Sequence, residues 1–175
     1  GCRGKAYPAW WHGNRSVMKD SLPVGDQVFP RIYSRKTRDN FARTEGLEGP
    51  SFERHLLTSL TGLEWDDGEL ETASARVVQL ERALLVRNWE RSRRDDQSVM
   101  PYFQRSEQQM NPMIGHRVAM DAQEFEKLLD RYYVLRGWDS KSGAPTGSTL
   151  KSFGLGPEAE ELEKRGLLPS EGGER

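Results

Sequence analysis

Two adjacent carboxylates, Asp95 and Asp96, could carry out acid–base catalysis, because such a pair can divide the roles of proton donor and acceptor. They directly follow a basic run that contains Arg91, Arg93 and Arg94. We therefore expect the pair to form salt bridges and helix-end contacts to these arginines. The basic run could also suggest phosphate binding. It has neither interleaved aromatic residues nor a glycine-rich loop, and it predicts a solvated, paired surface.

The three histidines, His12, His55 and His116, stand far apart and lack the spacing of paired metal ligands. A metal site or a nucleophile–base pair made from them is not expected. His55 is predicted at a helix surface or boundary. His12 follows two tryptophans and is predicted in core or interface packing, with proximity to a cofactor as the alternative. The single cysteine, Cys2, excludes an internal disulfide and a cysteine-only metal site within the chain, and we interpret it as a free thiol.

Composition limits the classes of function. The chain has 175 residues, 35% of them hydrophobic, a mean hydropathy of -0.81 and a net charge of -1. Nucleic-acid binding is disfavoured because there is neither a positive net charge nor a basic face. No apolar run of about 18 residues predicts a membrane span. The low cysteine content and the lack of a signal peptide predict a cytoplasmic protein. Gly1 in place of methionine indicates a processed, tagged or fragmentary chain.

Hydrophobic periodicity predicts helices joined by long loops. Residues 5–22 are predicted to form the first helix, and residues 23–50, rich in proline, glycine and charge, an ordered loop or docking segment. A helix follows from Ser51, which can cap it, to about Leu60, and Gly62 ends it.

The strongest periodic segment predicts a long helix from Asp67 to about Arg91. Asp66 and Glu69 have the spacing of a capping box at its start. One continuous apolar stripe is predicted along it, formed by Leu70, Ala73, Val77, Leu80 and Leu84.

A second clear helix is predicted after a long connection over residues 92–120. It begins at Asp121, which with Glu124 suits a capping box, and Gly137 ends it in the left-handed conformation. Its buried face is predicted to consist of Phe125, Leu128, Leu129, Tyr132 and Leu135. Short helices are predicted from Thr146 to Phe153 and from Pro157 to Arg165.

The fold class predicted from this pattern is all-α, because no useful length of chain alternates with period two. We expect one irregular multi-helix domain with long connecting loops over residues 1–168. Residues 169–175 are expected to be a disordered tail.

A compact motif, Tyr132–Asp139, combines a helix end with a turn and has a plain structural interpretation. Gly137 stops the helix, Trp138 folds back on it, and Asp139 caps the next turn or pairs with Arg136. Together with Gly143–Thr146 and Ser152–Leu155, this motif resembles the C-terminal signature of the tungsten-containing aldehyde ferredoxin oxidoreductases. The resemblance extends over roughly Gly4 to Leu168 through further segments in the family's order: Gly4–Ala6, Met18–Asp26, Val28–Pro30, Leu60–Trp65, Glu81–Ala83, Val86–Trp89, Arg91–Asp96 and Met100–Pro101.

The resemblance implies a function for the domain. These enzymes oxidise aldehydes to carboxylic acids with water and pass electrons to ferredoxin. Tungsten, or in some members molybdenum, is held by two pterins beside a [4Fe-4S] cluster. This domain would cover the metal–bispterin site without holding a complete active site or, by itself, a cofactor. The segment of Asp20, Val24, Gly25 and Asp26 would bind cofactor, with Asp20 as the pterin contact.

Gly25 departs from the family pattern, because it stands where a cysteine would be the fourth cluster ligand and glycine has no side chain to bind iron. Asp26 could instead supply an oxygen, or the cluster could be absent. Two hypotheses follow. The chain is part of such an oxidoreductase, with upstream domains, ferredoxin and a second copy of the chain as partners. Alternatively, it is a stand-alone helical accessory or interaction module that has lost the iron–sulfur ligand.

Overall fold

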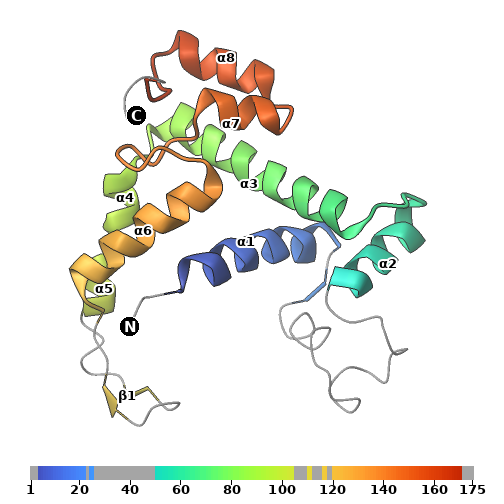
Figure 1. The fold of residues 1–175 in the computed structure, drawn as a ribbon, viewed down its shortest axis with the longest axis horizontal. Coiled ribbons are helices and arrows are strands. Elements are labelled where there is room, and N and C mark those ends of the chain that lie inside the picture. Colours follow the sequence, from blue (N-terminus) through green and yellow to red (C-terminus); the bar gives the residue numbers. More distant parts are fainter. Residues whose placement is uncertain are drawn as a thin grey trace. The chain divides into compact units, whose positions relative to one another are not determined.

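The computed structural model describes residues 4–22, 24–25, 50–104, 110–111, 116–117 and 120–170. These residues divide into two compact units (Figure 1). One unit is Trp11–Val78. The other, which is the larger unit, contains the chain up to Trp10 and from Gln79 onward. The described helices are α1 (Ala6–Ser21), α2 (Pro50–Thr61), α3 (Asp67–Trp89), α4 (Arg93–Gln97), α5 (Met100–Gln104), α6 (Ala122–Arg136), α7 (Gly147–Ser152) and α8 (Gly156–Lys164).

The predicted all-α class is confirmed. Within the described ranges the strands are β1 (Met110–Asn111) and β2 (His116–Arg117), which pair antiparallel over two residues each. An isolated bridge joins Trp138 to Pro145. The expectation of one domain over residues 1–168 stays a prediction, and its tail from residue 171 lies outside the described residues.

Local signals define the ends of α2 and α3 in the unit Trp11–Val78. α2 begins one residue before Ser51, and Gly62 ends it with a φ of 74°. At the start of α3 the Asp66 amide donates to Glu69 at 2.7 Å, and the Glu69 amide donates to Asp66 at 2.8 Å. The predicted capping box is therefore confirmed, and it satisfies two amides that the first turn leaves without helical partners.

The predicted apolar stripe of α3 is wrong over part of its length. Leu70 is fully buried, but Val77 is 38% exposed and Leu80 and Leu84 are only half-buried. The most deeply buried residues of α3 include three polar ones, Ser74, Gln79 and Arg82. Periodicity of apolar residues could not indicate this face, because Gln79 and Arg82 have hydrogen-bond partners elsewhere in the chain and Ser74 donates to the Leu70 carbonyl of its own helix.

The connection predicted over residues 92–120 contains more regular structure than expected. It includes α4, α5, β1 and β2. α4 begins with a capping box in which Asp95 accepts from the Ser92 amide at 2.8 Å. The spacing of Ser92 and Asp95 is that of a capping box and could have predicted α4. The interpretation of Asp95 as part of a charged run hid this signal.

Two predicted features of α6 have different outcomes. Asp121 accepts from the Glu124 amide at 2.9 Å, and Gly137 ends the helix with a φ of 69°. Both ends were predicted correctly. The predicted buried face is wrong at Leu135, which is 42% exposed, whereas Tyr133 is only 1% exposed. The polar partners of the Tyr133 hydroxyl allow the ring to occupy the interior.

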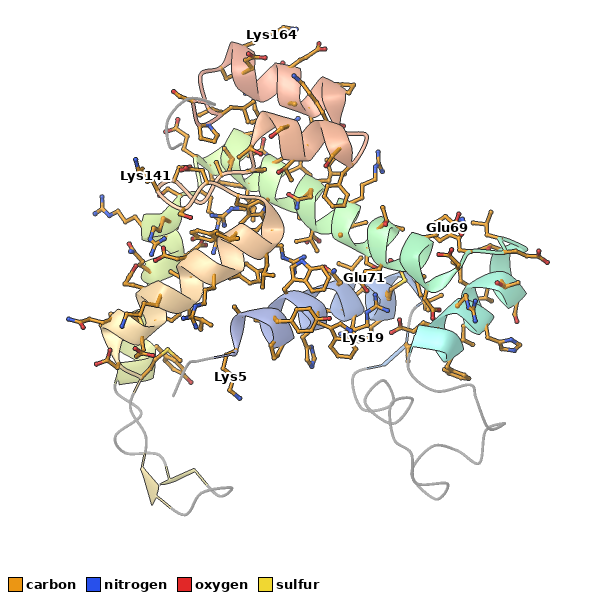
Figure 2. The ribbon with its side chains drawn as sticks, in the orientation of Figure 1. Lys5, Lys19, Glu69, Glu71, Lys141 and Lys164 are labelled. Carbon is orange, nitrogen blue, oxygen red and sulfur yellow. The ribbon has the colours of Figure 1, made fainter. Side chains whose placement is uncertain are left out.

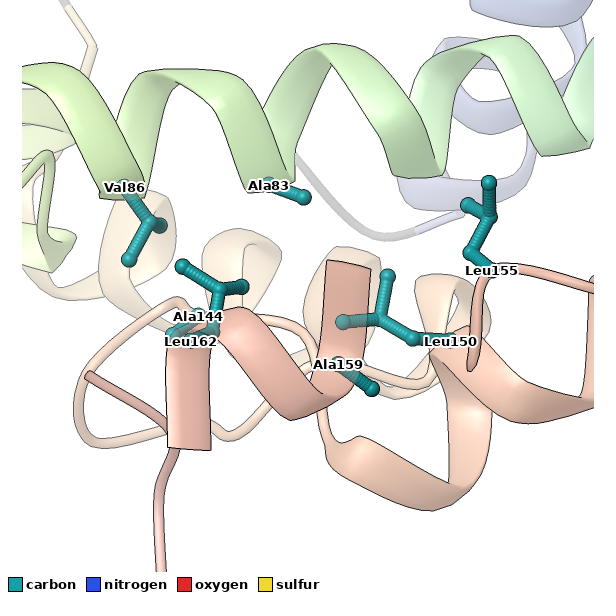
Figure 3. Packing of buried hydrophobic residues seen from close by; sticks show 7 residues of the cluster. All are labelled: Ala83, Val86, Ala144, Leu150, Leu155, Ala159 and Leu162. Atoms are coloured by element: carbon teal, nitrogen blue, oxygen red, sulfur yellow. The ribbon is translucent and has the colours of Figure 1, made fainter. Parts of the chain in front are cut away.

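The hydrophobic core of the larger unit lies where the second half of α3 meets α7 and α8 (Figure 3). α7 and α8 also pack directly against each other (Figure 1). Leu150, Leu155 and Leu162 are at most 1% exposed. Each such leucine contributes about 1.5–3 kcal/mol through burial. The core consists of Ala83, Val86, Ala144, Leu150, Leu155, Ala159 and Leu162.

Candidate cofactor-binding site

The candidate segment begins at the carboxyl end of α1, in the unit Trp11–Val78. α1 buries Asn14, Arg15 and Met18, whereas the side chain of Asp20 is 73% exposed. Lys19 Nζ lies 3.1 Å from Asp20 Oδ1 (Lys19 is labelled in Figure 2). A carboxylate with this exposure has lone pairs that can accept hydrogen bonds from a ligand.

The turn after α1 brings the other candidate residues to the same end of the helix. The Val24 amide donates to the Lys19 carbonyl at 3.0 Å. Val24 is half-buried and Gly25 is exposed. A Cβ placed on Gly25 would meet no atom of the described residues within 4 Å. Asp20 therefore lies in the last turn of α1, the Val24 amide bonds back to that turn, and Asp26 lies outside the described residues.

A buried arginine that sequence reasoning missed anchors α1. Arg15 is 1% exposed, its Nη1 lies 2.5 Å from Glu53 Oε2, and its Nη2 pairs with Glu71. The side-chain amide Nδ2 of Asn14 donates to the same carboxylate of Glu71. The available signal was spacing, because Arg15 stands three residues before the buried Met18 and so shares its helix face.

In the larger unit, Asp96 is the centre of a buried polar cluster. Its Oδ1 accepts from Arg82 at 3.0 Å and from Arg91 at 3.0 Å. Its Oδ2 accepts from Arg82 at 2.7 Å and from the Tyr133 hydroxyl at 2.5 Å. The predicted salt bridge of the Asp95–Asp96 pair is confirmed through Arg91. The contribution of Arg82 was not predicted, because it comes from a different helix.

The charges of this cluster suit a structural role better than proton transfer. Burial alone raises the pKa of Asp96, but the hydrogen bonds from Arg82 and Tyr133 outweigh it, and the pKa lies below its usual range. Burial and the hydrogen bond to Asp96 raise the pKa of the Tyr133 phenol. At neutral pH the carboxylate is ionised and the phenol keeps its proton. The acid–base interpretation of Asp95 and Asp96 therefore gains no support.

A second ion-pair cluster joins α4 to α6. Arg93 lies 2.6 Å from Glu126 Oε2 and 2.6 Å from Asp130 Oδ1. Burial lowers the pKa of Arg93, but the bonds to Glu126 and Asp130 outweigh it and the pKa is raised. The bond from Arg93 lowers the pKa of Glu126. Arg93 is thus paired, but with partners that lie more than 30 residues further along the chain and that the sequence did not predict.

The motif after α6 is held by side chains of α3. The Trp138 indole N–H donates to Gln79 Oε1 at 2.7 Å, and Gln79 Nε2 donates to the Arg136 carbonyl at 2.7 Å. The Arg82 guanidinium lies 4.7 Å from the centre of the Trp138 ring. Trp138 also packs edge-on against Tyr132, so it folds back on α6 as predicted. These contacts confirm the structural interpretation of the motif.

The turn after Trp138 is equally constrained. Asp139 accepts from the Ser142 amide at 2.7 Å and so caps the turn, one of the two predicted roles. Gly143 has a φ of 74°, and a Cβ there would lie 2.7 Å from Arg82 Nη2 and 3.0 Å from the Tyr133 hydroxyl. Arg82 Nε donates to the Gly143 carbonyl at 2.9 Å. Glycine at this position allows the chain to pass close to the Asp96 cluster.

The histidines take no part in a described site. His55 is exposed, as predicted. His12 is also exposed and lies edge-on to Trp11, so core packing is wrong for it, and its prediction at an interface or near a cofactor stays a prediction. The side chain of His116, like the whole of Cys2, lies outside the described residues. In the described chain no group of three or more His, Cys, Asp or Glu side chains is arranged to hold a metal ion.

The comparison with protein families decides the identity of the fold. Residues 3–155 match the model of "aldehyde ferredoxin oxidoreductase, domains 2 & 3". The chain belongs to this family. The match contains the candidate segment and every element from α1 to α7, and it ends where α8 begins.

A solved structure supports this assignment to the aldehyde ferredoxin oxidoreductase family. It is a chain of the active site complex BamBC of benzoyl-coenzyme A reductase, in complex with 1,5-dienoyl-CoA. The two chains share 27% identity and a TM-score of 0.52 over 75% of the present chain. The present chain spans only 19% of that structure's chain. Among curated proteins, none matches significantly.

Among the cofactors of the family, the described residues fit a pterin better than an iron–sulfur cluster. The exposed carboxylate of Asp20 can accept hydrogen bonds from the N–H groups of a pterin. Gly25 offers no side-chain donor to a cluster, and Val24 is aliphatic. The donor set therefore suits a pterin contact and lacks the thiolate that an iron–sulfur cluster requires.

Of the described helices, none is long and apolar enough to cross a membrane.

Proposed function

We propose that the chain covers the metal–bispterin cofactor of an oxidoreductase, with Asp20 as a hydrogen-bond acceptor for one pterin. The observation that carries this proposal is the exposed carboxylate at the end of α1, inside the region that matches the family. Val24 and Gly25 form the adjoining turn, and Asp26 completes the proposed segment.

The cofactor, when bound, would supply the two-electron oxidation that amino-acid side chains cannot perform. We propose tungsten or molybdenum as its metal. In the reaction an aldehyde and water give a carboxylic acid, two protons and two electrons, and ferredoxin accepts the electrons. The task of this chain is to orient a pterin through Asp20 and to exclude water from its covered face.

The remaining parts of such an enzyme would be contributed by partners. We propose upstream domains of the same enzyme for the rest of the metal–pterin site, ferredoxin as the redox partner and a second copy of the chain as an oligomer partner. We also propose a cytoplasmic location, because a low cysteine content is typical of proteins in a reducing compartment. The chain alone is expected to show no activity.

An Asp20→Asn variant of the whole protein, purified without oxygen, tests the proposed contact. Metal, iron and pterin are measured per protein, together with aldehyde-dependent reduction of a viologen dye. Loss of a hydrogen bond to a charged group weakens binding about tenfold or more, so cofactor retention is expected to fall. Asp67→Asn is the matched control, because Asp67 is also exposed and paired with a neighbouring cation, Arg54. Unchanged pterin content in Asp20→Asn would remove the basis of the proposal.

A second candidate function is reductive chemistry on a coenzyme A thioester. It is favoured by the structural likeness to a chain of benzoyl-coenzyme A reductase bound to a dienoyl-CoA. The same preparation distinguishes the two reactions. Reduction of the dye by a dienoyl-CoA, which is thereby oxidised in the reverse direction of the reductive reaction, supports the thioester substrate when no aldehyde reduces the dye. The opposite pattern supports aldehyde oxidation.

Gly25 supports the alternative of an accessory module without a cluster ligand. That alternative predicts a natively purified protein without tungsten, molybdenum or pterin, bound to another polypeptide. Stoichiometric metal and pterin in the native protein would exclude it.

A further inference from the structure

The strongest unassigned feature is a buried charge cluster that holds α1. We call Asn14, Arg15, Glu53 and Glu71 the α1 clamp, and Figure 2 labels Glu71 on α3. All four residues belong to the unit Trp11–Val78, as does Asp20. Asn14, Arg15 and Glu53 are at most 1% exposed, and Glu71 is 30% exposed.

The geometry of the α1 clamp restricts the helix in two directions. One guanidinium contacts carboxylates from two different helices, Glu53 on α2 and Glu71 on α3. Asn14, the neighbour of Arg15 on α1, donates to the same Glu71 carboxylate. Two adjacent α1 residues thus share one partner, so α1 cannot rotate or slide along its axis without breaking at least one of these contacts.

Stability alone is a poor explanation for such a cluster. A buried ion pair is often no more stabilising than apolar residues of similar volume, because the charges lose their hydration. Arg15 Nε is itself buried and makes no hydrogen bond to any residue that the structure describes. A guanidinium that binds two carboxylates in a fixed planar geometry instead favours one relative position of the helices that it joins.

Helix geometry connects the clamp to the candidate site. Asp20 follows Arg15 by five residues, which is about 140° around an α-helix. When Arg15 points into the interior, Asp20 therefore points toward solvent, as its 73% exposure shows. A rotation of α1 by one residue would turn Asp20 by about 100° away from that direction.

We propose that Arg15 is a positioning residue for the cofactor contact. Held between Glu53 and Glu71, it sets the rotation of α1 and thereby the direction in which Asp20 presents its carboxylate to a pterin. This inference rests on the proposed function, because it assumes that Asp20 meets the cofactor. It assigns the clamp a purpose that apolar packing would not provide.

The test replaces the charged clamp with apolar residues in the whole, cofactor-loaded protein. Arg15→Met alone would leave Glu53 buried without its cation and could unfold the unit, so the main variant combines Arg15→Met, Glu53→Leu and Glu71→Leu. Arg15→Lys is the second variant, because one ammonium cannot reproduce the fork. The matched control is Arg93→Met with Glu126→Leu and Asp130→Leu, which removes another arginine that bridges two carboxylates.

The readouts are pterin and metal content per protein, the electron paramagnetic resonance spectrum of the metal, and circular dichroism to check folding. A misplacement of about 1 Å can cost a hundredfold in function, so we expect at least a tenfold loss of bound pterin in a folded triple variant. Its spectrum should shift as in Asp20→Asn. Arg15→Lys should show the same change, and the Arg93 control should retain the wild-type content and spectrum.

The outcomes separate the inference from the proposed function. If Asp20→Asn alters pterin content and the folded α1-clamp triple does not, the positioning role is wrong and the Asp20 contact stands. A loss of pterin in the Arg93 control equal to that in the clamp triple also overturns the positioning role. If Asp20→Asn leaves pterin content and spectrum unchanged, the proposed contact fails and the positioning role fails with it.

Discussion

Gly137→Ala tests how tightly the motif after α6 is constrained. Gly137 has a φ of 69°, which disfavours any residue with a Cβ by about 1–2 kcal/mol. A Cβ there would overlap Thr149 Oγ1 and lie 3.0 Å from Thr149 Cγ2. Overpacking of this kind costs about 1–3 kcal/mol. We therefore expect Gly137→Ala to lower the free energy of unfolding of its unit by about 2–5 kcal/mol.

A matched control separates the two contributions. Gly154 has a φ of 70°, but a Cβ there would meet no atom within 4 Å. Gly154→Ala should therefore cost only the conformational part, about 1–2 kcal/mol. The difference between the two variants measures the overlap with Thr149.

A double-mutant cycle with Thr149→Ala completes the test. Thr149→Ala alone loses the 2.7 Å bond from Oγ1 to the Gly137 carbonyl and the 2.8 Å bond that Oγ1 accepts from Thr146, each worth about 1 kcal/mol. In the double variant the overlap is gone, so the coupling should recover about 1–3 kcal/mol. The assay is urea unfolding with hydrogen exchange at the Leu150 and Leu155 amides, which report on this unit. Equal costs for Gly137→Ala and Gly154→Ala, with no coupling, would refute the reasoning.

Three further predictions follow from the described contacts. Asp96→Asn should destabilise the larger unit by about 3–5 kcal/mol, because it leaves Arg82 without its anionic partner, and urea unfolding measures this loss. The pKa of Asp96 is lower in the folded than in the unfolded protein. Its contribution to the free energy of unfolding is therefore fully present above the unfolded value of about 3.9 and is lost as the pH falls through the folded pKa. The loss of stability with falling pH should consequently be less steep in Asp96→Asn. Glu90 has a φ of 50° and is exposed, so Glu90→Gly should raise the thermal midpoint through relief of about 1 kcal/mol of strain; a lowered midpoint would show that its side chain stabilises the turn. Gly25→Cys should fold normally because its Cβ meets open space, and in the whole protein it should raise the iron content if this position adjoins a cluster; unchanged iron would argue against that placement.

Much of the fold could be predicted because its signals are local. The capping residues Asp66 and Asp121 bond to amides within one turn of helix. Gly137 ends α6 through its own backbone conformation. Interactions of this kind depend on neighbours in sequence and hardly on the rest of the molecule, so a short segment is enough to indicate them. The family resemblance used the same local motifs.

The interior of each unit could not be predicted in the same way. Arg15, Arg82 and Tyr133 are buried although their polar groups favour water, because Glu53, Glu71 and Asp96 supply partners. These partners lie between 14 and 56 residues away in the sequence. Hydrophobic periodicity therefore placed Val77 and Leu135 inside and overlooked the buried polar residues.

The sequence by itself determined the all-α class, the ends of α2 and α6, the start of α3 and the membership of a family. Those properties follow from local hydrogen bonding, backbone conformation and motif order. Only the tertiary structure decided which charged groups are buried, among them Arg15, which lies between Glu53 and Glu71. The physical reason is that the burial of a charge depends on distant partners that compensate its lost hydration, and folding alone brings those partners together.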